Sequence, residues 1–294
     1  MPVRNYLPCV LAAVCLATMC LSAAPAFAAD MPAEPWLAPA PESAPPAFGD
    51  PFSSFAMRSD STRIDWQGFY AGGQFSYSDG NADFSKSTRD PVAFSLRNTT
   101  LENTFAPSSW QVLGTANHSA AGFGGFVGYN TVYLAPTARI VFGVEANWDQ
   151  ASLSLYAPSS PLSRVVPDGS NAVTITASGS VTDLNFGTLR ARAGWAVGNF
   201  LPYAFAGFAA GQANVNIAET TTVVQTSPPG TFVFSATAGK NNEWLYGFTV
   251  GGGLDYALTH HIFMRGEYEY VQFQTVAGTD INVNTVRLGA GLKF

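Results

Sequence analysis

One histidine of this chain stands beside residue types that could carry out acyl transfer. A site of that kind needs a histidine, a serine and an acid close together. His118 is followed directly by Ser119, and Glu102 or Asp83 could supply the acid. No His-x-Ser or Gly-x-Ser-x-Gly sequence surrounds them, so a polar loop histidine is the better interpretation and we predict no catalytic residue.

Two other features invite a ligand-binding interpretation and do not support one. His260 and His261 could bind a metal ion, but no third ligand accompanies them, so a solvated turn is favoured and no metal is predicted. The glycine runs 122–125 and 251–253 precede no helix-forming stretch and are not followed by the Lys and Ser or Thr of a phosphate-binding loop. We therefore expect no cofactor and no enzymatic activity.

Charged residues recur at alternate positions of extended segments, which suggests ion pairing as their chemistry. In residues 285–294, Arg287 and Lys293 fall on one side of a strand and Val286 and Leu288 on the other. If such faces line a narrow interior, their charges must pair, because an unpaired buried charge is expensive. The expected network in the lumen consists of Glu145, Asp149, Asp183, Arg190, Arg192, Asp255, Arg265, Glu267, Glu269, Arg287 and Lys293.

Eight segments of about ten residues show the alternation that would position these charges. Each has an apolar face and an opposite face rich in glycine, charged or amide residues. In the fifth segment Tyr203 and Phe205 are assigned to the outward face, so that Gln212 points inward. The predicted strands are 66–77, 121–129, 140–149, 183–197, 202–214, 244–256, 262–273 and 285–294.

The lengths of the connections separate two folds that share this alternation. A soluble β-sandwich would turn its apolar faces inward, whereas an outer-membrane barrel has short periplasmic turns and longer outer loops. The long polar connections are 80–118, 150–181, 215–242 and 274–281, and they alternate with short ones at 130–138, 198–201 and 257–261. We therefore predict an all-β protein, an eight-stranded antiparallel transmembrane up-and-down β-barrel.

Aromatic residues near the strand ends support a lipid-facing surface, because such rings anchor barrels at both membrane interfaces. The predicted aromatic girdles contain Trp66, Trp148, Trp195, Tyr203, Trp244, Tyr256 and Tyr270. Outer-membrane lipid and lipopolysaccharide are then the expected partners.

An eight-stranded barrel is just wide enough for its side chains to fill, so we expect a plugged lumen, with a narrow channel as the alternative.

The composition agrees with a barrel in lipid and excludes a nucleic-acid-binding protein. Charged residues make up 12% of the chain, against about 25% in typical soluble domains. The net charge of −6 leaves no basic surface for nucleic acid.

The first 62 residues are predicted to be two segments that precede the barrel. Arg4, an apolar run and the small-x-small sequence at 26–28 predict a secretory signal peptide over residues 1–28. All three cysteines lie within it. Residues 29–62 are crowded with proline, which predicts a disordered periplasmic linker that could contact peptidoglycan. The barrel would then occupy residues 63–294.

Five short motifs carry a family resemblance: Trp66-Gln67-Gly68-Phe69-Tyr70-Ala71-Gly72, Gly187-Thr188-Leu189-Arg190-Ala191-Arg192-Ala193-Gly194, Leu201-Pro202-Tyr203, Glu267-Tyr268-Glu269-Tyr270 and the terminal Phe294. Together they resemble the small outer-membrane β-barrel proteins of alphaproteobacteria, often labelled porin-family or surface-antigen proteins. OmpA's membrane domain is a more distant architectural relative. The resemblance covers about residues 64–294.

This resemblance implies an abundant protein of the Gram-negative outer membrane that supports the envelope and presents loops outside. Heme binding is claimed for some relatives, but no loop motif here carries a heme site. The resemblance also gives Phe294 a role as the signal read by the barrel-assembly machinery. A structural, surface-exposed barrel is our leading hypothesis; the alternatives are a small porin-like diffusion channel and, more remotely, an outer-leaflet lipid-modifying enzyme.

Overall fold

The computed structural model describes residues 64–136, 138–167 and 169–294. The predicted signal peptide at 1–28 and the predicted linker at 29–62 lie outside the described residues. The described part contains one sheet and a few short helices. None of those helices is both long and apolar enough to cross a membrane.

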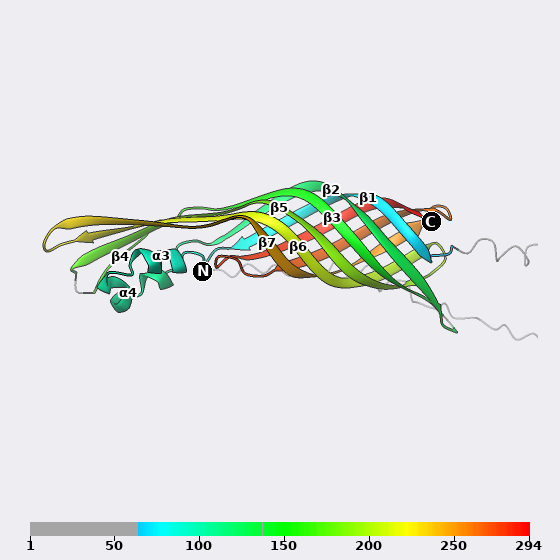
Figure 1. The fold of residues 1–294 in the computed structure, drawn as a ribbon, viewed down its shortest axis with the longest axis horizontal. Helices are drawn as coiled ribbons and strands as arrows, with labels where there is room; N and C mark the ends of the chain where they lie inside the picture. Colours follow the sequence, from blue (N-terminus) through cyan, green and yellow to red (C-terminus); the bar gives the residue numbers. More distant parts are fainter. Residues whose placement is uncertain (1–63, 137, 168) are drawn as a thin grey trace, which may run out of the picture. The chain divides into compact units, whose positions relative to one another are not determined.

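Within these residues nine strands form a single antiparallel sheet. Eight of them pair in a closed ring in which β9 returns to β1, and β4 pairs with β5 outside that ring (Figure 1). The up-and-down antiparallel class is thus confirmed, although the sheet has nine strands and not the eight predicted. The strands are β1 (Gly68–Asp83), β2 (Thr115–Leu134), β3 (Arg139–Ala157), β4 (Leu162–Val165), β5 (Asn171–Ala196), β6 (Phe200–Gln225), β7 (Gly230–Ala257), β8 (Ile262–Phe273) and β9 (Asp280–Lys293).

The ring closes where the first and last strands meet. β1 and β9 are antiparallel neighbours, with Tyr70 opposite Lys293 at one end. The backbone N–H of Phe294 donates to the carbonyl of Phe69 at 2.8 Å. Closure leaves no open sheet edge in the ring, and an open edge in lipid would expose unsatisfied backbone groups.

Three connections of three or four residues join strands that end at the level of the ring, and they lie at the end that also holds the start of β1 and the C-terminus (Figure 1). They are 135–138, 197–199 and 258–261, each close to a predicted short turn. In outer-membrane barrels short turns mark the periplasmic side. We therefore call this end periplasmic and the opposite end outer.

At the outer end, two of the predicted long loops are mostly strand. β3 continues to Ala157, β5 begins at Asn171, and β6 and β7 are separated only by residues 226–229. The sequence 173–178 alternates Val, Ile or Ala with Thr or Ser, a pattern that fits a strand with one buried face. We define the outer extension as β4 with residues 171–182 of β5, 214–225 of β6 and 230–243 of β7.

The long connection between β1 and β2 packs against this extension. It contains α3 (Arg89–Ser95), α4 (Thr100–Phe105) and the 3₁₀ helix η1 (Pro107–Ser109). Phe84 from its start is fully buried, in one apolar core with Val173 and Ile175 of β5. A Cβ atom at Gly179 would lie 2.7 Å from the Phe84 ring, so glycine allows this close approach.

Irregular pairing marks the level at which the strands leave the ring. The register shifts between Asp149 and Leu153 on β3, between Thr182 and Asn185 on β5, and between Ala213 and Val215 on β6. Bulges of this kind bend a strand and increase its twist. The three shifts together separate the ring from the outer extension.

Candidate functional site

Nine charged side chains meet inside the ring, and each comes from an inward-facing strand position. Alternate positions on paired strands point to the same side of a sheet, so residues far apart in sequence converge there. All nine are at most 4% exposed. They are Glu145 and Asp149 of β3, Arg190 and Arg192 of β5, Asp255 of β7, Arg265, Glu267 and Glu269 of β8, and Arg287 of β9.

On the periplasmic side of this network, two arginines share one aspartate. Asp255 pairs with Arg192 at 2.6 Å and with Arg265 at 2.8 Å. The contact with Arg265 is bidentate, with N–O distances of 2.8 and 3.2 Å. A guanidinium and a carboxylate match in this planar geometry. Arg265 also donates to Glu145 at 2.8 Å, which links this side to the centre.

The outer side of the network is built around Arg190 and Arg287. Arg190 pairs with Glu145 at 2.5 Å and with Glu267 at 2.7 Å. Arg287 pairs with Glu267 at 3.2 Å, and its Nε donates to Asp149 at 2.5 Å. Glu145 therefore bridges three arginines and Glu267 bridges two. The four arginines and five carboxylates form one connected network rather than separate pairs.

Glu269 completes the network and is held by neutral and charged donors. It accepts from Arg190 at 3.3 Å and from the hydroxyl of Thr249 at 2.7 Å, and it forms an ion pair with Arg287. A buried ion network stays stable only when its members are mutually paired and hydrogen-bonded. Removing one member would leave a buried charge without compensation.

Two tyrosines belong to the network and were missing from the predicted set. The hydroxyl of Tyr70 donates to Glu145 at 2.7 Å, and that of Tyr203 donates to Glu267 at 2.8 Å. The guanidinium of Arg192 lies 3.7 Å from the ring centre of Tyr203, a cation–π contact. Tyr70 has the parity of the inward-facing glycines of its strand, so the alternation could have identified it.

Tyr203 shows that the predicted phase of β6 is wrong. Tyr203 and Phe205 are 6% and 5% exposed and point into the lumen, whereas Phe208 is 77% exposed and Gln212 also faces outward. Arg190 lies 4.1 Å from the ring centre of Phe205. Aromatic rings are stable inside this lumen because they stack on guanidinium groups. Tyr203 is therefore not part of an aromatic girdle.

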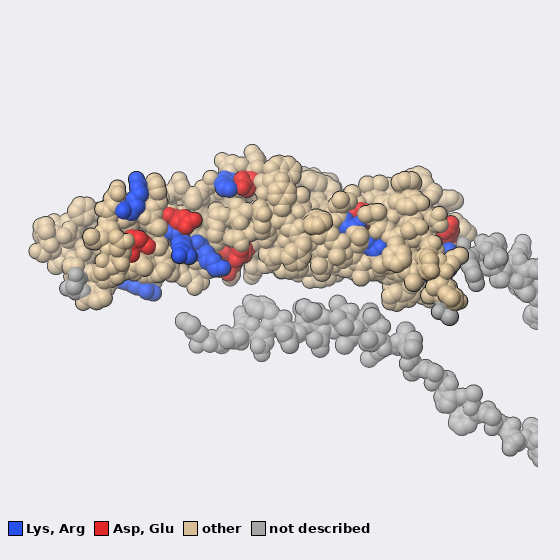
Figure 2. All heavy atoms as spheres, turned by 60° about the horizontal axis from the view of Figure 1, so that its bottom comes forward, with Lys and Arg blue, Asp and Glu red and all other residues tan. Residues whose placement is uncertain are grey.

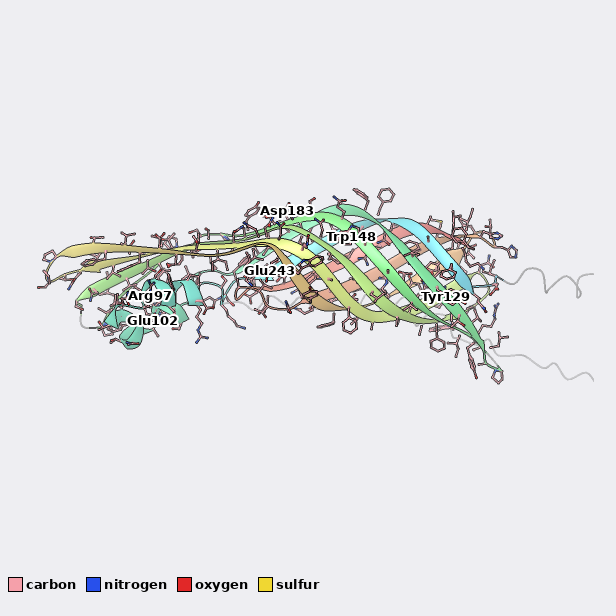
Figure 3. The ribbon with its side chains drawn as sticks, viewed as in Figure 1. Arg97, Glu102, Tyr129, Trp148, Asp183 and Glu243 are labelled. Carbon is pink, nitrogen blue, oxygen red and sulfur yellow. The ribbon has the colours of Figure 1, made fainter. Side chains whose placement is uncertain are left out.

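Trp66 is a second correction to the girdle, since it is 3% exposed and packs inside the periplasmic end. Its ring meets that of Phe263 edge-on at a centroid distance of 6.4 Å. The other predicted girdle residues face outward, and Figure 3 shows Trp148 on the outer surface of the barrel. Trp148, Trp195, Trp244 and Tyr256 are exposed, and Tyr270 is partly exposed.

Two residues of the predicted network lie outside it. Asp183 is exposed at the bulge of β5, with a φ of 56°, and accepts a hydrogen bond from Asn214 at 2.9 Å. The bulge adds a residue to the strand and turns this side chain outward. Lys293 is half-buried at the periplasmic rim, where its ammonium donates to the backbone carbonyl of Asp65. It is too near the strand end to reach the carboxylates of β8.

Apolar layers lie on both sides of the charged layer. The outer core contains Phe186, Leu245 and Val271 and continues into the outer extension. The periplasmic layer joins residues of the ring to those just before β1. It consists of Ile64, Trp66, Tyr70, Phe126, Val141, Leu201, Ala257 and Phe263.

The outside of the ring has the opposite chemistry. Phe75, Leu288 and Phe208 are 78%, 68% and 77% exposed there. The face drawn in Figure 2 is mostly uncharged over the ring, and charged side chains are more frequent toward the outer end. Exposed apolar area of this extent suits contact with hydrocarbon.

Comparison with known proteins agrees with this geometry. The family model described as "Outer membrane protein beta-barrel domain" matches residues 51–294. The 25 kDa outer-membrane immunogenic protein of Brucella ovis is 30% identical over 108 residues, which cover 37% of this chain and 42% of that protein. Its counterpart from Brucella canis is 30% identical over 116 residues, which cover 37% and 46%. The chain thus spans less than half the length of these relatives.

Two solved structures are also similar. Ail of Yersinia pestis has 10% identity and a TM-score of 0.29, covering 78% of this chain and 99% of its own. Neisserial surface protein A has 12% identity and a TM-score of 0.31, covering 77% and 97%. Scores this low add no independent support. Because the family model matches more than half of the chain, the protein belongs to the outer-membrane β-barrel domain family and resides in the outer membrane of a Gram-negative bacterium.

Proposed function

We propose that this protein is a closed, non-catalytic barrel that stabilises the outer membrane and presents its outer extension at the cell surface. The observation that carries the proposal is the charged layer, in which nine buried groups pair across the lumen. A ring of eight strands is just wide enough for its side chains to fill. These side chains fill it with mutually paired charges.

Opening such a layer to ions is unfavourable. A permeating ion would have to displace Arg190 or Arg287 from the carboxylates with which they pair. Among the described residues, those carboxylates could then pair only with the remaining arginines of the network. Breaking one partner of a buried pair typically costs about 3–5 kcal/mol. This supports a plugged barrel over the porin-like channel.

The outer extension supports the surface-presenting part of the proposal. It stands beyond the bulges, its apolar core is continuous with the outer core of the ring, and the connection that contains α3 and α4 packs against it. Arg97 and Glu102, labelled in Figure 3, lie on this outer region. This packed surface is available for recognition from outside the cell.

The catalytic alternative receives no support from the residues that suggested it. His118 and Ser119 are consecutive in β2, so their side chains point to opposite faces. The hydroxyl of Ser119 donates to Asp79 at 2.9 Å, and Glu102 accepts instead from the hydroxyl of Ser108. Ser119 and Glu102 are thus engaged in separate contacts.

Conductance of the purified monomer in planar bilayers tests the proposal. We expect no steady openings from protein whose heat-modifiable migration shows that it is folded. Steady openings of that folded protein would favour the channel alternative. In parallel, a deletion strain should leak periplasmic protein and become sensitive to detergent, and the wild-type gene should reverse both effects.

A further inference from the structure

The outer part of β7 has a sheet neighbour on one side only. Residues 230–243 face β6, whereas β8 pairs with β7 only from Gly247 onward. Within the part of the chain that the structure describes, no other strand pairs with residues 230–243. Figure 1 shows the hairpin of β6 and β7 reaching away from the ring. One long edge of the extension sheet is therefore open.

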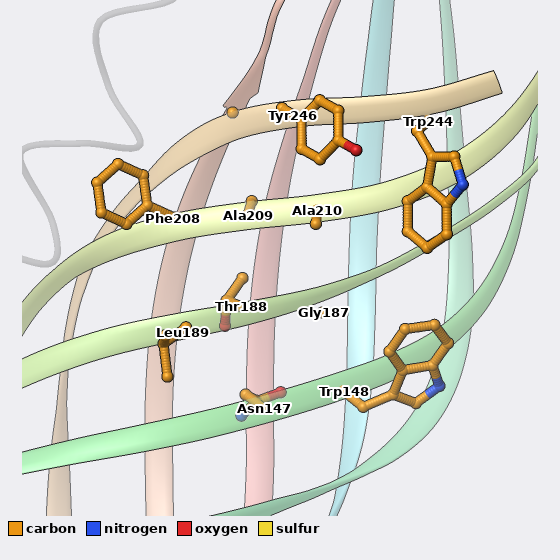
Figure 4. A pocket seen from close by; sticks show the side chains of 11 residues that line it. Asn147, Trp148, Gly187, Thr188, Leu189, Phe208, Ala209, Ala210, Trp244 and Tyr246 are labelled. Atoms are coloured by element: carbon orange, nitrogen blue, oxygen red, sulfur yellow. The ribbon is translucent and has the colours of Figure 1, made fainter.

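This open edge lies beyond the aromatic level of the ring. Trp244 and Tyr246 are exposed, and Figure 4 shows their rings on β7, next to β6. Rings at such positions lie at the membrane interface. Residues 231–239 lie between these rings and the tip of the hairpin, so they stand in water on the outer side. An extended edge there is free to pair with a strand of another molecule.

Alternate residues of β7 direct their backbone N–H and C=O groups to this edge. The carbonyl of the outward-facing Tyr246 accepts from the backbone N–H of Gln274 at 2.8 Å, on the side away from β6. Backbone groups of an antiparallel strand alternate between its two neighbours in step with its side chains. The register shift adds one residue to β7, so its outward residues are even-numbered in the ring and odd-numbered in the extension. The outward residues of the open edge are Thr231, Val233, Ser235, Thr237 and Gly239, and all are exposed.

The sequence of this edge lacks the features that normally prevent strand pairing. Edge strands are usually protected by charged residues, proline or bulges. Residues 231–239 read Thr-Phe-Val-Phe-Ser-Ala-Thr-Ala-Gly, with no charge and no proline, and they pair with β6 in continuous register. β-Branched and aromatic residues favour an extended strand. The edge is therefore straight, uncharged and suited to pairing.

We propose that this edge pairs with the same edge of a second copy of the protein, antiparallel, with Ser235 of one copy opposite Ser235 of the other. In this register Val233 lies opposite Thr237, and Thr231 lies opposite Gly239. Each of the five outward residues thus meets another of the set. Directly opposed residues of this kind exchange two backbone hydrogen bonds, so the five pairs form about ten.

The chemistry of the edge favours a second copy over a different partner. Five evenly spaced residues centred on Ser235 complement themselves under a two-fold rotation. No like charges meet within the pair, because the stretch is uncharged. Lys240, the first charged residue beyond it, is already paired with Glu243 at 2.7 Å and offers no free charge to a foreign strand. On the other face of the sheet, α3 is held by a hydrogen bond from Ser95 to Glu219, which leaves the outward face uncovered.

The antiparallel arrangement determines where the two copies reside. β6 and β7 run without a break from the ring into the extension, so the tip of their hairpin points away from the membrane. A two-fold axis that makes the paired edges antiparallel turns the two rings in opposite directions. The two copies therefore lie in facing membranes, and the contact joins neighbouring cells. This inference rests on the surface presentation in the proposed function and names a partner for it.

Nanodiscs that each hold one copy test the inference, because only a contact between discs can then double the mass. We expect wild-type discs to pair in a concentration-dependent way, measured by light scattering. Ser235→Lys places like charges opposite each other and should weaken pairing at least about tenfold. Ser235→Asp should do the same. An equimolar mixture of the two variants should restore pairing, since each lysine then faces an aspartate.

Thr176→Lys is the matched control. Thr176 lies opposite Thr220, and Thr220 lies opposite Ser235, so this charge occupies the same row two strands away from the edge. Heat-modifiable migration shows that each variant is folded. Pairing of the control and of the mixture, but of neither Ser235 variant alone, supports the inference.

Three outcomes overturn it: wild-type discs that stay single at every concentration, Ser235→Lys discs that pair like the wild type, or a mixture that fails to pair. Conductance of the same purified protein reports separately on the closed barrel, and protease digestion of intact cells reports whether the extension reaches the surface. A protein that is closed and accessible but does not pair contradicts the inference alone.

Discussion

The ring and the outer extension are built from the same strands but bury opposite kinds of side chain. In β5, Arg190 and Arg192 point into the ring, whereas Val173 and Ile175 point into the core of the extension. The outward positions change in the reverse sense, from Leu189 in the ring to hydroxyl residues in the extension.

The surroundings explain this difference. A strand must match the medium outside it, so the ring places apolar residues toward lipid and is left with polar ones for its interior. The extension stands in water and can bury apolar residues in the ordinary way. The bulges at the level of Asp149, Asp183 and Asn214 mark where the polar interior of the ring gives way to the apolar interior of the extension.

The largest expected effect comes from breaking the charged layer. Glu145→Gln removes the carboxylate that contacts Arg190, Arg192 and Arg265. It should lower the free energy of unfolding by about 3–5 kcal/mol, because three buried arginines lose a counter-charge. Urea unfolding from lipid vesicles measures the change. Asp183→Asn is the control, and a loss equal to that of Glu145→Gln would contradict a special role for the lumen.

A charge placed on the outward face should destabilise the ring more than the outer extension. Val144→Arg puts a cation on the lipid-facing side of β3 and should destabilise the barrel by about 2–4 kcal/mol if it lies near the bilayer midplane. Thr176→Arg makes the matched change on the exposed face of the extension, where surface substitutions usually stay within about 0.5 kcal/mol. Similar unfolding curves for the two variants would show that the two surfaces do not face different media.

A single hydroxyl inside the ring should have a smaller effect. Tyr203→Phe removes the hydrogen bond to Glu267, and bonds to charged groups contribute about 1.5–3 kcal/mol. Tyr256→Phe is the control, since Tyr256 faces outward and is 37% exposed. In the same unfolding assay, the free energy of unfolding of Tyr203→Phe should be clearly lower than that of the wild type. A result indistinguishable from Tyr256→Phe would mean that the hydroxyl is dispensable.

The smallest effect on stability is expected at the chain end. Phe294 is 77% exposed, so Phe294→Ala removes little packing from the finished ring. We expect less assembled protein in fractionated outer membranes with unchanged secretion, because the assembly machinery would read this residue. Phe69→Ala, at the neighbouring exposed ring, serves for comparison. Normal assembly of Phe294→Ala would remove the proposed signal.

Much of the ring could be predicted because lipid imposes a strict alternation. The strands that contain Arg190, Asp255 and Arg287 show one apolar face, and an apolar face toward lipid leaves the charges no place but the lumen. The short turns followed from the same reasoning. The charged residues of β8 were placed correctly inside the ring, where Glu267 and Glu269 meet Arg287.

Other features depended on contacts between distant segments. In β6 both faces contain apolar residues, so alternation alone could not tell which one faces Arg190. The strands of the extension were hidden in polar sequence, since Val173 and Ile175 needed Phe84 and α3 to form a core. Asp183 lies outside the lumen because of a bulge in β5, which the alternation of residue types does not predict.

The sequence alone determined the strands of the ring, the faces of those with a clear alternation and most of the charges of the lumen, because these follow from the two-residue period of an extended chain and from the cost of placing charge in lipid. Only the tertiary structure decided which charges pair, where the strands leave the membrane and which way the ambiguous strand turns. Those outcomes depend on register and bulges, which are set by neighbouring strands that a local pattern does not contain.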